Sequence, residues 1–129
     1  AYGGVRFFRF GRSGRVVVDN VDAKTATLRE LENSLLLYFT GKTRSSDILL
    51  SEQGRRMVGN RRSMDRIRDL ADVARRALED GDAHGIGRVL DASWKIKRRL
   101  AAGMTDPDID AFYAKAKRLG ALGGKLTGA

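Results

Sequence analysis

The sequence contains no cysteine and a single histidine, His84, among its 129 residues. Disulfide bonds and thiolate metal sites are therefore excluded, and a zinc site built from several histidines cannot be assembled. No apolar run approaches the roughly 20 residues that span a bilayer, and the first residues lack the charged-then-apolar order of a signal peptide. The cytoplasm is the compartment that we expect, and we expect no membrane partner.

Recognisable catalytic patterns are also missing. The lone histidine cannot be placed in a Ser-His-Asp triad with any identifiable partners, and no spacing of paired carboxylates indicates glycosidase or acid–base chemistry. We therefore expect no catalytic residue and no metal ligand within these residues.

The net charge is +9, with 25 Lys and Arg against 16 Asp and Glu. Nucleic acid, a membrane surface or an anionic metabolite are the partners that such a charge suggests. The basic residues alternate with acidic ones, which is typical of solvated helix faces. A nucleic-acid-binding stripe is the alternative, although one dense basic face with interleaved aromatic residues is missing. The basic pairs are Arg55-Arg56, Arg61-Arg62, Arg75-Arg76 and Arg98-Arg99, and the acidic residues among them are Asp65, Asp69, Asp72, Glu79 and Asp80.

The amino-terminal part of the chain predicts strands. VRFFRF (5–10) and VVVD are rich in aromatic and β-branched residues, and the GRSGR between them supplies a glycine-containing hairpin loop. TATLRELENS is expected to form about two turns of helix, and LLLYF (35–39) has the length of a buried strand. TGKTRSS then reads as a polar loop, with Ser45 or Ser46 as N-cap of a helix through DILLSEQGRRM.

The remaining sequence predicts three helices, each bounded by a start signal and a glycine stop. The first two are expected to form a helical hairpin, with Trp94 packed beside the apolar stripe of the second. Lining a substrate pocket is the alternative role for this tryptophan. The start and stop residues are Ser63 and Gly81, Asp82 and Gly103, and Asp106 with Pro107 and Gly120.

Strands first and helices afterwards predict the α+β class, with helices on one side of a mainly antiparallel sheet. The expected sheet contains the amino-terminal hairpin, a strand near 35–39 and the start of a strand near 122–127. About four to five helices are expected to cover it. A chain of this length forms one domain at most.

Two loops are candidates for binding an anion. In YFTGKTRSS, a nucleotide P-loop would require a glycine five residues before Gly41, where Leu36 stands. What remains is a strand end followed by a helix N-terminus, which favours a phosphate. Arg44 would clamp two phosphate oxygens with its planar guanidinium, whereas Lys42 would act as a point charge. A plain polar connection is the alternative.

The second candidate is GALGGKLTGA, residues 120–129. Its four glycines allow the backbone to approach a ligand without Cβ clashes. A plain helix-to-strand turn needs only one or two of them. A mobile glycine-rich tail remains the alternative.

Three segments, LENSLLLYFTGKTRSSDILLSEQ, DASWKIKRRL and TDPDIDAFYAKAKRLGALGGKLTGA, together resemble the carboxy-terminal half of the GHMP small-molecule kinases. The family's third motif is GGK-x-x-GAGGGG, and this chain carries GGKLTGA. TG-x-x-R-x-S and SW-x-x-K also agree in order and spacing. The resemblance covers nearly the whole chain and is greatest to the bacterial heptose-phosphate kinases.

The resemblance implies a kinase that uses ATP and Mg²⁺ to phosphorylate the anomeric hydroxyl of D-glycero-D-manno-heptose 7-phosphate, for nucleotide-activated heptose synthesis. It implies that residues 1–129 are a single partial domain of the GHMP carboxy-terminal type, incomplete because the amino-terminal ATP-binding half and the last strand are absent. Residues 1–129 alone are then expected to be inactive. Its substrate- and phosphate-binding residues carry over to Thr40, Gly41, Arg44, Ser45, Gly123, Gly124, Lys125, Thr127 and Gly128, with Arg44 as the expected contact of the sugar's existing phosphate.

Two other functions stay open. A basic helical module that binds nucleic acid or a protein partner is supported by the net charge, and its binding would fall steeply with salt. A non-catalytic paralogue of the kinases, acting as a regulator or scaffold, would keep only the substrate half of the fold.

Overall fold

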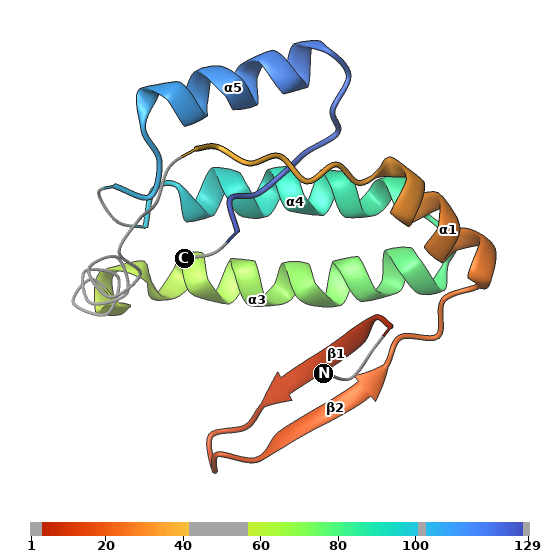
Figure 1. Cartoon of the computed structure of the whole chain (residues 1–129). Helices are drawn as coiled ribbons and strands as arrows, with labels where there is room; N and C mark the ends of the chain where they lie inside the picture. Colours follow the sequence, from red (N-terminus) through yellow and green to blue (C-terminus); the bar gives the residue numbers. More distant parts are fainter. Residues whose placement is uncertain (1–3, 42–56, 101–102, 128–129) are drawn as a thin grey trace.

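The computed structural model describes residues 4–41, 57–100 and 103–127, and it has the α+β class that the sequence predicts. Figure 1 shows helix α4 between α3 and α5, with the β-hairpin on the opposite side of α3 and α1 beside the turn that joins α3 to α4. The elements are β1 (Arg6–Phe10), β2 (Val16–Asn20), α1 (Thr25–Ser34), α3 (Met57–Glu79), α4 (Ala83–Lys97) and α5 (Pro107–Arg118).

The β-hairpin is confirmed. β1 and β2 pair antiparallel with Phe10 opposite Val16, and the loop between them is closed by a bond of 2.8 Å from the Gly11 amide to the Arg15 carbonyl. The hairpin contacts the helices through Phe7, because the Arg75 guanidinium of α3 lies 5.4 Å from the centre of its ring. A cation held over an aromatic face is attracted by the ring quadrupole.

The predicted helix starts at Asp82 and Asp106 are confirmed, whereas α4 ends at Lys97, before the predicted end at Gly103. The Asp82 side chain accepts a bond of 2.8 Å from the Gly85 amide at the start of α4, and Asp106 caps α5 in the same way, with Pro107 as the first helical residue. Gly81 ends α3 with a φ of 86°, a conformation that favours glycine. These signals are local in sequence, and for that reason the sequence alone reveals them.

Helix α3 begins at Met57, earlier than the predicted start at Ser63. The added residues include Asn60, whose side-chain amide donates a bond of 2.8 Å to the Leu100 carbonyl beyond the end of α4. This contact joins residues far apart in sequence, so hydrophobic periodicity does not reveal it. The helix expected through DILLSEQGRRM lies outside the described residues, except for Met57.

The core lies around the α3–α4 hairpin and the start of α5. Trp94 and Leu100 are each 2% exposed, so the prediction that Trp94 packs inside the protein is confirmed. The other buried hydrophobic residues are Leu78, Ala83, Met104 and Ile109.

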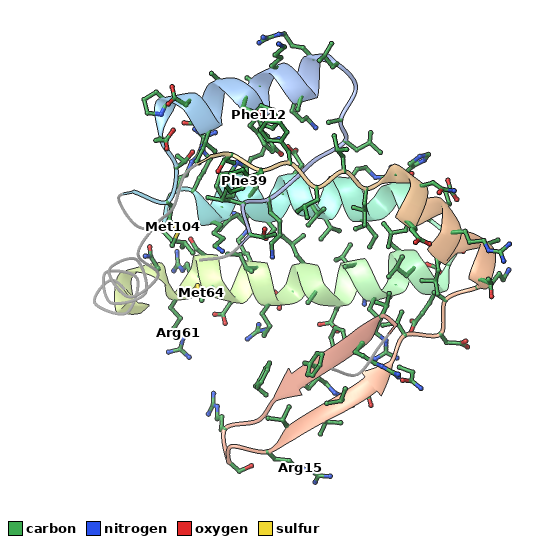
Figure 2. The ribbon with its side chains drawn as sticks, in the orientation of Figure 1. Arg15, Phe39, Arg61, Met64, Met104 and Phe112 are labelled. Atoms are coloured by element: carbon green, nitrogen blue, oxygen red, sulfur yellow. The ribbon has the colours of Figure 1, made fainter. Side chains whose placement is uncertain are left out.

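Two of the expected strands are not formed in the described part of the chain. Residues 35–39 leave α1 without regular structure, and residues 121–127 also lack it. Leu36 and Leu37 are 89% and 90% exposed. A strand requires a hydrogen-bonded neighbour, whereas an apolar run only indicates that one would fit. The Tyr38 ring nevertheless stacks on Phe112 of α5, with the ring centres 4.3 Å apart, and Figure 2 shows Phe112 on the side of α5 that faces this segment.

Candidate functional site

Both candidate loops lead to helix α5. The 35–41 segment reaches it through the Tyr38–Phe112 stack, two residues before Thr40. The glycine-rich segment reaches the next residue of the helix, because a Cβ on Gly124 would lie 3.6 Å from the Tyr113 ring. The structure therefore brings the two predicted loops to neighbouring residues of one helix.

The described site residues come from these two segments. Thr40 is half-buried, and Gly41 has a φ of 70°, a conformation that favours glycine. In the second segment Gly123 and Gly124 are half-buried, whereas Lys125 and Thr127 are exposed. The predicted site residues Arg44, Ser45 and Gly128 lie outside the described residues.

Helix α5 ends in a turn that directs the glycine-rich segment back towards α4. Gly120 has a φ of 101°, and the amide of the next residue, Ala121, bonds the Ala116 carbonyl at 3.0 Å. This arrangement is a Schellman motif. The Lys117 ammonium adds a bond of 2.7 Å to the Leu122 carbonyl. Backbone and side chain of α5 thus fix the course of the segment after the turn.

The segment crosses α4 at very short range. A Cβ on Gly87 of α4 would lie 2.6 Å from the Leu122 Cβ. A Cβ on Gly123 would lie 1.9 Å from the Gly87 carbonyl oxygen and 2.6 Å from the Asp91 amide nitrogen. Gly123 thus approaches the backbone of α4, and the approach of these glycines to a ligand stays a prediction.

Asp91 of α4 is the centre of a polar cluster beneath this crossing. Its Oδ1 accepts a bond of 2.7 Å from the Tyr113 hydroxyl and lies 3.6 Å from the Lys117 ammonium. Its Oδ2 lies 2.7 Å from the Lys95 ammonium. The carboxylate therefore joins α4, α5 and, through Lys117, the carbonyl of Leu122.

The surroundings shift the pKa of both hydrogen-bonded partners. Burial alone would raise the pKa of Asp91, but the bonds from Lys95 and Tyr113 and the charge of Lys117 hold it below its ordinary value. Burial, together with the bond to the Asp91 carboxylate, raises the pKa of Tyr113. The pair is therefore an ionised carboxylate with a neutral phenol, which suits a structural role better than proton transfer.

Lys97 and Lys125 form a second charged feature. Burial, and then repulsion by the Lys125 ammonium, lowers the pKa of Lys97. The neighbouring Arg98 behaves differently, because its guanidinium pairs with Asp110 at 2.6 Å. Lys125 of the glycine-rich segment thus acts electrostatically on a half-buried cation of α4.

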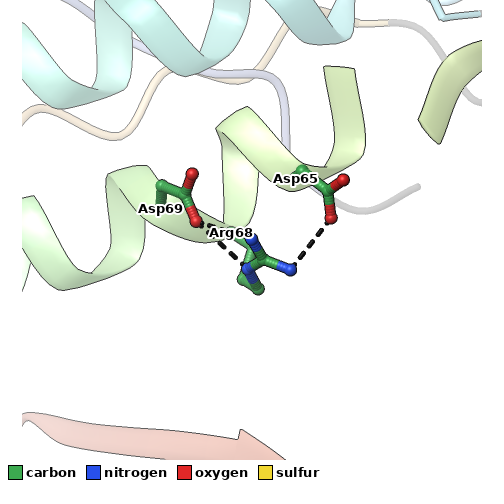
Figure 3. Close-up of polar contacts among 3 residues, drawn as sticks. All are labelled: Asp65, Arg68 and Asp69. Atoms are coloured by element: carbon green, nitrogen blue, oxygen red, sulfur yellow. Dashed lines mark hydrogen bonds and ion pairs between the residues drawn. The ribbon is translucent and has the colours of Figure 1, made fainter. Parts of the chain in front are cut away.

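Two basic residues of α3, Arg68 and Arg75, pair with acidic residues on the same helix. Figure 3 shows Arg68 between Asp65 and Asp69, at 2.9 Å and 2.8 Å. Arg75 and Glu79 form a further pair at 2.8 Å. This pairing is what we expect of a solvated helix face.

The described residues contain neither a candidate metal site nor a helix that could span a membrane. They contain no group of three His, Cys, Asp or Glu side chains placed to hold a metal ion. No helix among them is long and apolar enough to cross a membrane.

Sequence reasoning missed the residues that hold the segment in place. The i to i+4 spacing of Asp91 and Lys95 is a local signal for their ion pair that was not used, and nothing local indicates that Tyr113, 22 residues later, bonds the same carboxylate. Gly87 was also missed, although a glycine inside a helix often marks a close approach.

Comparison with known proteins confirms the resemblance seen in the motifs. Residues 74–129 match the family described as GHMP kinases C terminal. The chain is also 29% identical over 132 residues to a D-glycero-alpha-D-manno-heptose 7-phosphate kinase of Campylobacter jejuni subsp. jejuni. The alignment covers 99% of this chain and 38% of that kinase. The chain therefore spans well under half the length of this relative.

Proposed function

We propose that this chain, whose residues 74–129 match the family of GHMP kinase carboxy-terminal regions, is a portion of an ATP-dependent sugar-phosphate kinase. The observation that carries the proposal is the similarity of the entire chain to a heptose 7-phosphate kinase. Its substrate would be D-glycero-D-manno-heptose 7-phosphate, and the anomeric hydroxyl would receive the phosphoryl group.

Residues 1–129 would then be one partial domain, and ATP and Mg²⁺ would be bound mainly by the rest of the protein. Transfer of a phosphoryl group depends on positioning and on neutralising charge. The contribution of this chain would be the backbone of Gly123, Gly124 and Gly128, the hydroxyl of Thr127 and the charge of Lys125. Because ATP is the donor, we place the reaction in the cytoplasm.

The second loop would contribute to sugar binding. Thr40, Gly41 and Ser45 would line the site, and the Arg44 guanidinium would bind the phosphate already present on the sugar. The anchoring of this loop to α5 by Tyr38 supports its inclusion in the same site as the glycine-rich segment. The 129-residue chain alone would bind substrate weakly and catalyse no transfer.

A steady-state assay of the complete gene product tests the proposal. ADP release is measured with MgATP and heptose 7-phosphate, or with the same heptose lacking its phosphate. We expect release with the first sugar, a loss of about tenfold or more in kcat/KM for Lys125→Met, and a higher sugar KM for Arg44→Met at unchanged ATP KM.

Lys115→Met is the matched control, because Lys115 is exposed and lies in the last turn of α5. It should leave the kinetics unchanged. Absence of ADP release with any heptose phosphate would contradict the kinase assignment. Equal losses in the Lys115 and Lys125 variants would contradict the proposed role of Lys125.

A further inference from the structure

The cations around the crossing of α4 and the glycine-rich segment mostly have carboxylate partners. Lys95 pairs with Asp91 at 2.7 Å, and Arg98 pairs with Asp110 at 2.6 Å. Lys117 of α5 lies 3.6 Å from the Asp91 carboxylate. Each of these three side chains therefore has a carboxylate within 4 Å, and Lys95 and Lys117 share that of Asp91.

Lys97 and Lys125 are the exceptions on this side of α4. Neither ammonium has a carboxylate partner among the residues that the structure describes. Gly123 lies on α4 at Asp91 and Gly124 lies against Tyr113, so the segment brings Lys125 towards the last turn of α4, where Lys97 is half-buried. Besides burial, the charge of Lys125 contributes to the lowered pKa of Lys97, and neither lysine has a counter-charge among the described residues.

The side chain one turn before Lys97 also lacks a partner. Trp94 is 2% exposed, and its indole nitrogen has no acceptor within the described part of the protein. Residues three apart in a helix share a face, so Trp94 and Lys97 lie on the same side of α4. Buried donors are normally paired, so one without an acceptor calls for an explanation, of which a bound water or ion is one.

We propose that Lys97 and Lys125 together bind a phosphate group. A phosphate monoester carries nearly two negative charges at neutral pH and accepts several hydrogen bonds, so it matches two ammonium groups. The inference rests on the proposed function and adds Lys97, the lysine of the SW-x-x-K segment, to its site. The phosphate belongs either to the sugar or to the nucleotide.

The protein contains a single tryptophan, Trp94, which lies three residues before Lys97 in α4. Its fluorescence therefore reports on the surroundings of Lys97. The 129-residue chain is titrated with inorganic phosphate at constant ionic strength, and circular dichroism verifies that each variant is folded. We expect a saturable change of emission, with affinity lowered about tenfold or more by Lys97→Met and by Lys125→Met. Lys97→Arg keeps the charge and should retain most of the binding.

Lys95→Met is the matched control, because Lys95 is on the same helix, is exposed and already has a carboxylate partner. It should bind phosphate as the unaltered chain does. Unchanged affinity in Lys97→Met, or an equal loss in Lys95→Met, overturns the proposal, since the second result indicates only a diffuse positive potential.

The complete gene product distinguishes the source of the phosphate. If the sugar phosphate occupies the pair, Lys97→Met raises the KM of heptose 7-phosphate, and if the nucleotide does, it raises the KM of ATP. A change in neither KM overturns the proposal. If phosphate binding depends on Lys97 but the complete protein has no kinase activity, the anion site stands and the proposed kinase function is wrong.

Discussion

The Tyr113 hydroxyl donates a hydrogen bond of 2.7 Å to Oδ1 of Asp91 and thereby joins α5 to α4. The same tyrosine also faces the backbone amide of Gly124. One side chain therefore contacts both the Asp91 carboxylate and the glycine-rich segment. The geometry of that segment therefore depends on residues outside the motif.

Replacing Tyr113 by phenylalanine should lower the free energy of unfolding by about 1 to 2 kcal/mol, because a half-buried carboxylate loses a donor. Urea unfolding followed by circular dichroism measures the change. Tyr38→Phe is the control, since Tyr38 is 56% exposed and keeps its ring stack on Phe112. Equal effects of the two substitutions would show that the bond to Asp91 contributes nothing.

The lowered pKa of Asp91 predicts a loss of stability in acid. A carboxylate whose pKa is lower in the folded state stabilises the protein above its unfolded pKa, and this contribution disappears as the pH falls through the folded value. The difference in unfolding free energy between the wild type and Asp91→Asn should therefore be largest near neutral pH and shrink below about pH 4. A difference that stays constant from pH 7 to pH 3 would contradict this.

The raised pKa of Tyr113 predicts the opposite behaviour in alkali. Its neutral form is favoured in the folded state, so the contribution of Tyr113 to stability should be constant below about pH 10 and should fall above it. Absorbance at alkaline pH should show one tyrosine ionising later than the others, and Tyr113→Phe should remove that late step. A late step that survives the substitution belongs to another tyrosine.

The short approach of the glycine-rich segment to α4 predicts which glycines tolerate a methyl group. Gly123→Ala and Gly87→Ala should each lower the free energy of unfolding by about 1 to 3 kcal/mol. The new Cβ at Gly123 would lie 1.9 Å from the Gly87 carbonyl oxygen, and the new Cβ at Gly87 would lie 2.6 Å from the Leu122 Cβ. Gly124→Ala should leave the stability nearly unchanged, because the new Cβ would lie 3.6 Å from the Tyr113 ring, an ordinary van der Waals contact. Thermal unfolding ranks the three variants, and a Gly123→Ala variant as stable as Gly124→Ala would contradict the crossing.

Gly59→Ala is the positive control for this series. Gly59 lies inside α3, and nothing is within 4 Å of its added Cβ. Alanine there should stabilise the protein by about 0.5 to 1 kcal/mol, since glycine is a poor helix former. A loss of stability would indicate a contact that the structure does not contain.

The elements that could be predicted from the sequence are those whose signals are local. The GRSGR loop between aromatic and β-branched runs predicted the hairpin, and Asp82 and Asp106 predicted two helix starts. These residues act within a few positions of themselves, on backbone amides or through their own φ angles.

What could not be predicted depends on partners distant in sequence. The LLLYF run has the composition of a strand, but pairing depends on a neighbouring strand, and Leu37 remains 90% exposed. The glycine pattern predicted a close approach to a ligand, whereas the close approach in the structure is that of Gly123 to α4, which the pattern could not identify. The Asp91 cluster combines three segments and has no local signature beyond its pair with Lys95.

The most direct test of the account is a phosphorus NMR measurement on the complete gene product with MgATP and D-glycero-D-manno-heptose 7-phosphate. The account predicts a new sugar phosphate resonance with the coupling of an anomeric phosphate, growing together with ADP, and no such signal with the 129-residue chain alone. A spectrum in which ATP and the sugar phosphate persist unchanged with the complete protein would contradict it.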